Sequence, residues 1–206
     1  MNAGRLITFE GMDGCGKSTQ ARLLAEGLAS KGLDVVLTRE PGGSPGAEEI
    51  RQLLVEGPPE RWSAETEILL FTAARRDHLE RKIRPALKRG ATVISDRFAD
   101  STRVYQGAVR PELRALAERL HDAVIGIDPD LTFIIDMDPA EALRRGLDRD
   151  SHEHRFEKMG RGFQDRVRTE FRTLASDNPD RCHLIDGHRD VDAIAHDISR
   201  IADPRQ

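Results

Sequence analysis

Gly11-Met12-Asp13-Gly14-Cys15-Gly16-Lys17-Ser18 is the stretch that decides the fold of this chain, and it directly follows the apolar run Leu6-Ile7-Thr8-Phe9. It fits G-x-x-x-x-G-K-[ST] between a predicted strand and a predicted helix. Glycines let successive backbone N–H groups point at one anion, and the N-terminus of the following helix adds partial positive charge. Lys17 supplies a cation for the outer phosphates, and Ser18 can hold magnesium. The segment therefore predicts a loop that binds nucleotide phosphates.

Apolar β-branched runs recur along the chain, at Val35–Leu37, Thr92–Ile94, Leu131–Ile135 and Leu184–Ile185, each followed by a polar helical stretch. This alternation predicts an α/β fold of the P-loop NTPase type, a five-stranded parallel sheet with helices on both faces. Ligands of such sheets bind beyond the carboxyl ends of the strands. The predicted helices span Lys17–Lys31, Pro45–Glu56, Ala64–Lys88, Pro111–Val124, Pro139–Asp148, Phe156–Ala175 and Val191–Ile201.

Length and composition predict a single cytoplasmic domain over residues 1–206. Lys and Arg total 32 against 36 Asp and Glu, and the net charge of −4 argues against binding nucleic acid by bulk electrostatics. The first strand begins too early to leave room for a signal peptide, and no apolar stretch approaches the length of a membrane helix. Cys15 and Cys182 give no metal-ligand spacing and fit a reducing compartment. We interpret Cys15 as a packing residue; an oxidisable thiol is the alternative.

Charged residues follow the second and third predicted strands, in Thr38-Arg39-Glu40-Pro41-Gly42-Gly43-Ser44 and Ser95-Asp96-Arg97-Phe98. Phe71 and Arg75 are spaced i, i+4 on the longest predicted helix, so their side chains share one face. Taken singly, such arginines are often surface residues and such a phenylalanine is often core. Together they predict a second site, in which arginines bind a phosphate and an aromatic ring stacks on a base.

The segment Asp96-Arg97-Phe98-Ala99-Asp100-Ser101-Thr102-Arg103-Val104-Tyr105-Gln106-Gly107 resembles the thymidylate kinase signature D-R-[YHF]-x-x-S-x-x-A-Y-Q-G. Thr38–Gly43, Phe71–Arg75 and Pro129–Leu131 with Asp136 are similar to further motifs of that family, in the same order. Phe98 stands where Tyr or His is commoner, and Val104 where Ala is usual; neither change removes a catalytic group.

The resemblance implies transfer of the γ-phosphoryl group of ATP to dTMP, giving ADP and dTDP, with Mg²⁺ as cofactor. Lys17 would stabilise charge on the transferring group, and Ser18 would bind magnesium. Asp13 would help to place the magnesium or the acceptor 3′-hydroxyl, and Asp96 would serve the magnesium-water shell. The implied ATP-binding residues are Gly11, Met12, Asp13, Gly14, Cys15, Gly16, Lys17, Ser18 and Thr19, with Arg145 packing against adenine.

On the acceptor side, the resemblance implies that Arg39 and Arg97 bind the monophosphate of dTMP. Phe71 would stack on thymine, and Arg75 would hydrogen-bond its exocyclic oxygen. Tyr105 would lie against the 2′ carbon of the sugar and exclude a ribose hydroxyl. Ser101, Thr102 and Gln106 complete the implied substrate-binding set, with Thr102 at the base edge.

The polar, Arg-rich stretch at about residues 145–157 sits between two predicted helices, as a short mobile lid would. Thymidylate kinases carry the arginine that stabilises the transition state either in the phosphate loop or in the lid. Gly14 occupies the loop position here, so the resemblance implies the lid class, with Arg149 and Arg155 as candidates. A solvated, charged helix end is the alternative reading of this stretch.

Two other functions fit the phosphate-binding loop taken alone. One is a related kinase for a different small acceptor, which Ser101, Thr102 and Tyr105 disfavour. The other is a non-catalytic nucleotide switch, which would not need Arg39, Arg97, Phe71 and Arg75 together. The resemblance also implies a homodimer, in which the long helix Ala64–Lys88 could pack against its copy.

Overall fold

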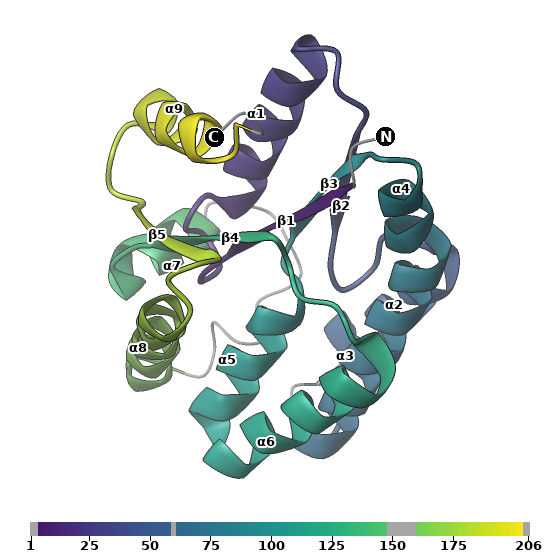
Figure 1. The fold of residues 1–206 in the computed structure, drawn as a ribbon. Coiled ribbons are helices and arrows are strands. Elements are labelled where there is room, and N and C mark those ends of the chain that lie inside the picture. The colour runs from purple at the N-terminus through teal and green to yellow at the C-terminus, as the bar shows by residue number, and fades with distance from the viewer. Residues whose placement is uncertain (1–3, 59–60, 148–159, 204–206) are drawn as a thin grey trace.

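Five parallel strands form one sheet in the spatial order β2-β3-β1-β4-β5 (Figure 1). This arrangement comes from a computed structural model, which describes residues 4–58, 61–147 and 160–203. The order places β1 at the centre, between β3 and β4, and confirms the predicted sheet. The strands are β1 (Arg5–Glu10), β2 (Val35–Arg39), β3 (Thr92–Asp96), β4 (Leu131–Asp136) and β5 (Cys182–Asp186).

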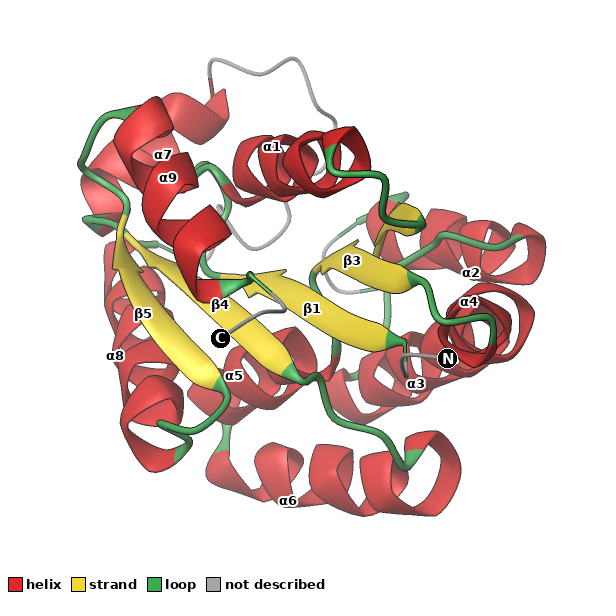
Figure 2. Cartoon of the chain, turned by 45° about the horizontal axis from the view of Figure 1, so that its top comes forward, coloured by secondary structure: helices red, strands yellow, loops and turns green. Residues whose placement is uncertain are grey.

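Helices cover both faces of the sheet. The two helices α1 and α9 lie together on one face, and α5 and α8 lie on the other, with α6 packed outside α5 (Figures 1 and 2). The largest apolar core includes Ile7 and Phe9 of β1 and Phe133 of β4, all fully buried. The helical segments are α1 (Lys17–Ser30), α2 (Pro45–Val55), α3 (Ala64–His78), η1 (Leu79–Ile83), α4 (Arg84–Lys88), α5 (Ala99–Val109), α6 (Pro111–Leu120), η2 (His121–Ile125), α7 (Pro139–Leu147), α8 (Arg161–Asp177) and α9 (Val191–Ile201).

Helix boundaries follow local sequence signals. The Ser63 side chain accepts a hydrogen bond from the Thr66 N–H and caps α3, and Asp190 caps α9 in the same way. Pro45 stands at the start of α2, where proline does not remove a needed N–H. Gly32, at φ 81°, follows α1 and ends it.

The helix α5 is absent from the sequence prediction, and its buried face explains why. Asp100, Thr102, Arg103 and Gln106 are all buried there beside Val104, Tyr105 and Ala108, so polar side chains interrupt the apolar period of 3.6 residues. Polar partners in the fold satisfy these side chains: Arg103 donates to Asp100 at 2.9 Å. A helix whose buried face is partly polar cannot be recognised from hydrophobic periodicity.

Other boundaries differ in detail. The predicted helix Ala64–Lys88 is continuous but widens into the π-helical turn η1 just before Pro85, which has no N–H to donate and crowds the preceding turn. The prediction Pro111–Val124 likewise ends in a π-helical turn, η2. The predicted start at Phe156 lies outside the described residues, and Gly160 at φ 80° precedes the observed start of α8.

The carboxyl ends of all five strands carry charged residues at one edge of the sheet. Asp96 of β3 is in register with Phe9 of β1 and with Arg39 of β2. Since the strands are parallel, the loops that leave this edge meet above it, and this is where ligands of such sheets bind. The strand-end residues are Glu10, Arg39, Asp96, Asp136 and Asp186.

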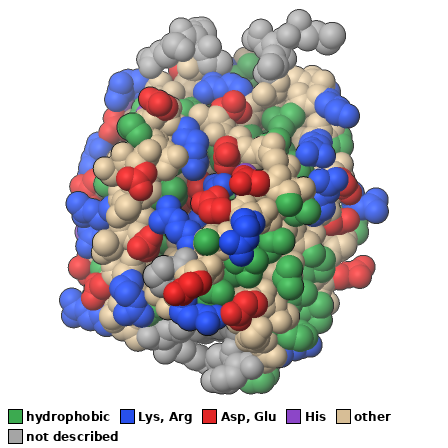
Figure 3. Space-filling model, turned by 60° about the horizontal axis from the view of Figure 1, so that its bottom comes forward, with side chains coloured by type: hydrophobic (Ala, Val, Ile, Leu, Met, Phe, Trp, Pro, Cys, Tyr) green, Lys and Arg blue, Asp and Glu red, His purple; other side chains and the backbone are tan. Residues whose placement is uncertain are grey.

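The surface gives two broader observations. On the face shown in Figure 3, acidic and basic side chains are intermixed, in keeping with the net charge of −4. Within the described ranges, none of the helices has the length and apolar character needed to cross a lipid bilayer.

Candidate active site

The phosphate-binding loop, Gly11–Ser18, joins β1 to α1 and depends on glycine at defined points. Gly14 and Gly16 have φ of 82° and 102°, in the left-handed region that other residues rarely adopt. A Cβ on Gly11 would lie 2.7 Å from the Ile135 carbonyl oxygen, so the loop passes too close to β4 for any side chain there. The first N–H groups of α1 have no intrahelical acceptors. The curled backbone can therefore surround an anion, as predicted.

Lys17 is folded into this loop. Its Nζ donates to the Met12 carbonyl at 2.7 Å and lies 3.9 Å from the Cys15 sulfur, and the residue is only 6% exposed. The ammonium is thus held at the loop, beside the position that a phosphate would take. Burial raises the pKa of the Cys15 thiol, which supports the interpretation of Cys15 as a packing residue.

Ser18 and Asp96 meet at the base of the loop. Ser18 Oγ donates to Asp96 Oδ2 at 2.5 Å, while Asp96 Oδ1 is buried without a hydrogen-bond partner among the described residues. Hydroxyl and carboxylate oxygens are hard ligands of the kind that Mg²⁺ prefers, and Mg²⁺ keeps most of its water. An unsatisfied buried carboxylate oxygen beside a hydroxyl fits a magnesium site that takes few protein ligands. The described residues hold no cluster of three or more His, Cys, Asp or Glu that would suit a different metal.

Arg97 follows directly after β3 in an uncommon conformation. Its φ is 71°, a left-handed value that costs energy for a residue with a Cβ. The guanidinium donates to Asp13 at 2.5 Å, to Ser101 at 2.8 Å and to the Gly11 carbonyl at 3.3 Å. Although burial alone would lower the pKa of Arg97, the Asp13 carboxylate raises it well above its ordinary value. Arg97 is therefore a fixed cation between the phosphate-binding loop and α5.

Glu10 fixes the segment that follows Arg97 by hydrogen bonds. The carboxylate is fully buried and accepts from the Phe98 N–H at 2.8 Å and from Ser101 Oγ at 2.5 Å. Burial, and next the nearby Asp100, raise the pKa of Glu10 to about 7, against the lowering effect of these hydrogen bonds and of Arg97. Its two oxygens thus hold Phe98 and Ser101, which follow Arg97 at the start of α5.

A pocket opens beside Arg97, between α2, α3 and α5. Phe71 is half-buried and faces this space instead of the core. Arg75 is 5% exposed and donates to Glu40 at 2.7 Å, to the Phe98 carbonyl at 3.0 Å and to Thr102 at 3.1 Å. The pocket thus combines an aromatic ring with an oriented guanidinium. It is lined by Asp13, Glu40, Pro41, Leu54, Val55, Phe71, Arg75, Arg97, Phe98, Ser101, Thr102, Tyr105 and Gln106.

Tyr105 forms one wall of this pocket. The Arg97 guanidinium lies 5.3 Å from the centre of its ring, and Phe163 and Phe171 of α8 pack against it at 6.4 and 6.1 Å. Burial raises the pKa of the Tyr105 hydroxyl above its usual range. Gln106 is 1% exposed and donates to Glu67 at 3.4 Å. Both side chains are held rigidly from outside the pocket.

Arg39 lies apart from the pocket around Arg97, with which the sequence predicts that it shares an anion. It is the last residue of β2, so its side chain points away from those of Thr38 and Glu40. Arg39 is 57% exposed and pairs with Glu48 at 3.3 Å, in the groove that also contains Ser18 and Asp96. Strand alternation places Glu40 in the pocket instead. The sequence contains this signal, since the strand continues to Arg39, but the prediction ended the strand at Leu37.

Other pocket residues were also absent from the prediction. Leu54 and Val55 come from the end of α2, and Pro41 from the turn after β2. Because it is the packing of α2 against α3 that brings these residues to Phe71, no local motif predicts their place.

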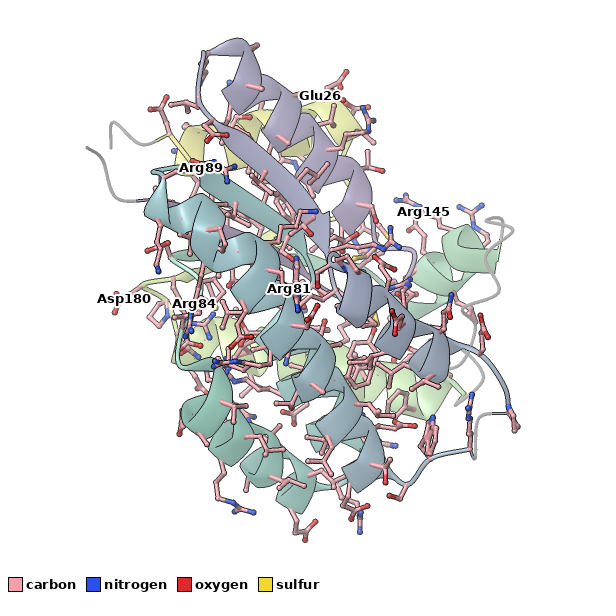
Figure 4. All side chains as sticks on the ribbon, turned by 90° about the vertical axis from the view of Figure 1, so that its right-hand side faces the viewer. Glu26, Arg81, Arg84, Arg89, Arg145 and Asp180 are labelled. Atoms are coloured by element: carbon pink, nitrogen blue, oxygen red, sulfur yellow. The ribbon has the colours of Figure 1, made fainter. Side chains whose placement is uncertain are left out.

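Arg145 lies near the end of α7 and forms an ion pair with Glu141. Figure 4 shows it on the opposite side of the molecule from Arg89 and Asp180, which precede β3 and β5. Arg145 is therefore at the same edge of the sheet as the phosphate-binding loop, although no contact with that loop is among its described interactions. Arg149 and Arg155, with most of the predicted lid 145–157, lie outside the described residues.

Comparisons with known proteins agree with this geometry. The family model described as thymidylate kinase matches residues 9–198. A thymidylate kinase of Dinoroseobacter shibae is 66% identical, over 95% of this chain and 94% of that protein, and one of Ruegeria pomeroyi is 61% identical, over 96% and 94%. The crystal structure of thymidylate kinase from Ehrlichia chaffeensis has a TM-score of 0.77 at 38% identity, covering 97% of this chain and 98% of that one. With the family model matched over most of this chain's length and relatives of 61% and 66% identity, the chain belongs to the thymidylate kinase family.

Proposed function

We propose that this chain transfers the γ-phosphoryl group of ATP to dTMP, giving ADP and dTDP for the synthesis of dTTP. The observation that carries the proposal is the Asp13–Arg97 ion pair, which lies between the phosphate-binding loop and the aromatic pocket. A phosphate bound by Arg97 would therefore lie next to a phosphate bound by the loop. Phosphoryl transfer depends on such positioning and on charge neutralisation more than on covalent chemistry.

On the donor side, the loop N–H groups and Lys17 would bind the phosphates of ATP and stabilise charge on the transferring group. Ser18 and Asp96 would hold Mg²⁺, which supplies charge neutralisation on the phosphate oxygens when it is bound. Asp13, at 40% side-chain exposure, faces both sites and would orient the sugar hydroxyl or the magnesium-bound water.

On the acceptor side, Arg97 would bind the monophosphate and Phe71 would stack on the thymine ring. Arg75 would donate to the exocyclic oxygen of the base, next to Thr102. Tyr105 would lie under the sugar and leave no room for a ribose hydroxyl. The assignment of Arg39 to the same monophosphate stays a prediction from the sequence, since its side chain lies outside the pocket and pairs with Glu48.

The lid arginines remain a proposal from sequence. Gly14 leaves the phosphate-binding loop without an arginine, and this supports Arg149 or Arg155 as the donor that stabilises the transition state, with Arg145 beside adenine.

We further propose that the protein works in the cytoplasm as a homodimer without a nucleic-acid or membrane partner. Leu69, which is 54% exposed, and Ala73 lie one turn apart on the exposed side of α3, where a second copy could cover them. Sedimentation at several concentrations tests the dimer, and a monomer at every concentration would contradict it.

The direct test of the activity measures ADP formation with Mg-ATP and a panel of dTMP, dUMP, dCMP, AMP, GMP and thymidine at equal concentration. A strong preference for dTMP is the expected result. Preference for another acceptor would keep the phosphate-binding loop but overturn the roles of Phe71, Arg75 and Tyr105. Binding of ATP without turnover of any acceptor would favour a nucleotide switch.

A further inference from the structure

Behind the base-reading Arg75 lies a closed network of four buried side chains. Glu40 accepts from Arg75 Nε with Oε2 at 2.7 Å, and its Oε1 lies 3.0 Å from Nδ1 of His78. Nε2 of His78 in turn lies 2.8 Å from the Thr38 hydroxyl. Arg75, Glu40 and Thr38 are 5%, 5% and 8% exposed, and His78 is fully buried. None of the sequence motifs assigned a role to His78 or to Glu40.

The network is set by the periods of two elements. Thr38 and Glu40 are two residues apart at the end of β2, so they point to the same side. Arg75 and His78 are three residues apart on α3, so they also share a face. Thr38 and Glu40 therefore face the two helix residues directly. The Arg75 guanidinium and the His78 imidazole both contact the Glu40 carboxylate.

The turn after β2 closes over the network. A Cβ on Gly43 would lie 2.5 Å from His78 Nε2 and 2.6 Å from the Thr38 hydroxyl. The imidazole thus has no space to turn, and its hydrogen bonds are fixed. With Nδ1–H donating to Glu40 and Nε2 accepting from Thr38, a neutral His78 satisfies both partners.

The hydrogen bonds to Arg75 determine which of its donors face the pocket. Nε is held by Glu40, and Nη2 by the Phe98 carbonyl and by Thr102. This leaves the Nη1 hydrogens without a partner among the described residues. A guanidinium only donates, so it matches the 4-keto oxygen of thymine and rejects the 4-amino group of cytosine.

We infer that Glu40 and His78 are positioning residues that fix the direction in which Arg75 presents its donors, and thereby the discrimination between 4-keto and 4-amino pyrimidine acceptors. The inference rests on the proposed function, because it assigns Arg75 to the base. His78 acts indirectly. Its hydrogen bond fixes the Glu40 carboxylate, and the carboxylate fixes the Arg75 guanidinium. Loss of His78 leaves one oxygen of a buried carboxylate without its donor and lets the carboxylate turn away from Arg75.

The test compares His78→Leu with His78→Asn, whose amide can replace the Nδ1–H donor. Kcat and KM are measured for dTMP and for dCMP at saturating Mg-ATP, together with Tm. For His78→Leu we expect KM for dTMP to rise by on the order of 10- to 100-fold with little change in kcat, and the preference for dTMP over dCMP to fall in proportion. His78→Asn should recover most of both. His183→Leu, a histidine on β5 that packs on Phe133, is the matched control and should change neither.

Arg75→Gln separates the inference from the function on which it rests. If Arg75→Gln leaves the preference unchanged, the proposed base site is wrong. If Arg75→Gln removes the preference and His78→Leu keeps it, with KM also unchanged, the positioning role is wrong. If His78→Leu does not fold, Glu40→Gln and Thr38→Val carry the same measurement, because both keep the side-chain shape. An unchanged preference in Glu40→Gln would overturn the inference equally.

Discussion

The phosphate-binding loop and the pocket beside Arg97, which contains Phe71 and Arg75, lie side by side but are built in different ways. The loop is one continuous stretch, and its ligands are backbone N–H groups that any sequence with the right glycines can present. The pocket is assembled from side chains of several segments: Asp13 of the loop itself, the turn after β2, α2, α3, the turn after β3, and α5. The comparison shows that a backbone site can be read from a motif, whereas a side-chain site depends on how elements pack. The experiments below test how separate the two halves are.

The largest effect should come from Lys17→Ala in the loop. Lys17 is the buried ammonium beside the phosphate position, so its loss should lower kcat by on the order of a thousandfold. Because Lys17 does not line the pocket, calorimetric titration with dTMP alone should show unchanged affinity. Weaker dTMP binding in this variant would mean that the two halves are not independent.

Arg97→Ala removes the cation that lies between the phosphate-binding loop and the pocket. We expect the fall in kcat/KM for dTMP to correspond to a loss of about 3 kcal/mol in transition-state stabilisation. The variant loses a phosphate ligand and leaves Asp13 without its Arg97 partner. KM for ATP should change little. Arg110→Ala is the control, because Arg110 forms an exposed ion pair with Glu65 away from the pocket. An equal loss in both variants would contradict the assignment of Arg97.

Glu10 allows a test by pH at the place where the loop and the pocket meet, because it hydrogen-bonds to Phe98 and Ser101 next to Arg97. Its pKa is raised from 4.5 to about 7, so between these values the folded protein holds a proton that the unfolded chain releases. The free energy of unfolding of the wild type, minus that of Glu10→Gln, should therefore fall by about 2 kcal/mol as pH rises from 5 to 8. Urea denaturation at several pH values measures this difference. A difference that rises or stays flat across this range would show that Glu10 is ionised throughout.

The smallest effect is expected for Arg39→Ala. Its ion pair with Glu48 is exposed, and such pairs contribute about 1 kcal/mol or less. Turnover of dTMP should stay within about threefold of the wild type. A loss as large as that of Arg97→Ala would place Arg39 on the acceptor phosphate after all, as the sequence prediction had it.

Much of the fold was predictable because it depends on local signals. The five β-branched runs became the five strands, and Pro45 and Gly32 marked helix ends where proline and glycine usually do. The helix α5 was missed because Asp100 and Arg103 satisfy each other inside the fold, which a count of apolar residues does not register.

The site divides in the same way. Gly11–Ser18 folds as its motif indicates, and Arg75 and Phe71 share a helix face as their spacing required. Glu40 lines the pocket and Arg39 does not, and the sequence did not indicate this because an error of two residues in the end of a strand hides which of two neighbours points inward. His78 could not be predicted, since its role depends on β2 lying against α3.

Arg97 and Asp13 form an ion pair between the phosphate-binding loop and the pocket, so the protein itself supplies an anionic partner for the guanidinium. A dianionic nucleotide that enters the pocket therefore exchanges one anionic partner of the guanidinium for another, and does not meet an uncompensated positive charge. Long-range attraction between this site and anions in solution is correspondingly small, so dissolved salt has little to screen. The pocket recognises its ligand by contact and shape, and small inorganic anions gain little there because they bring no base to stack on Phe71.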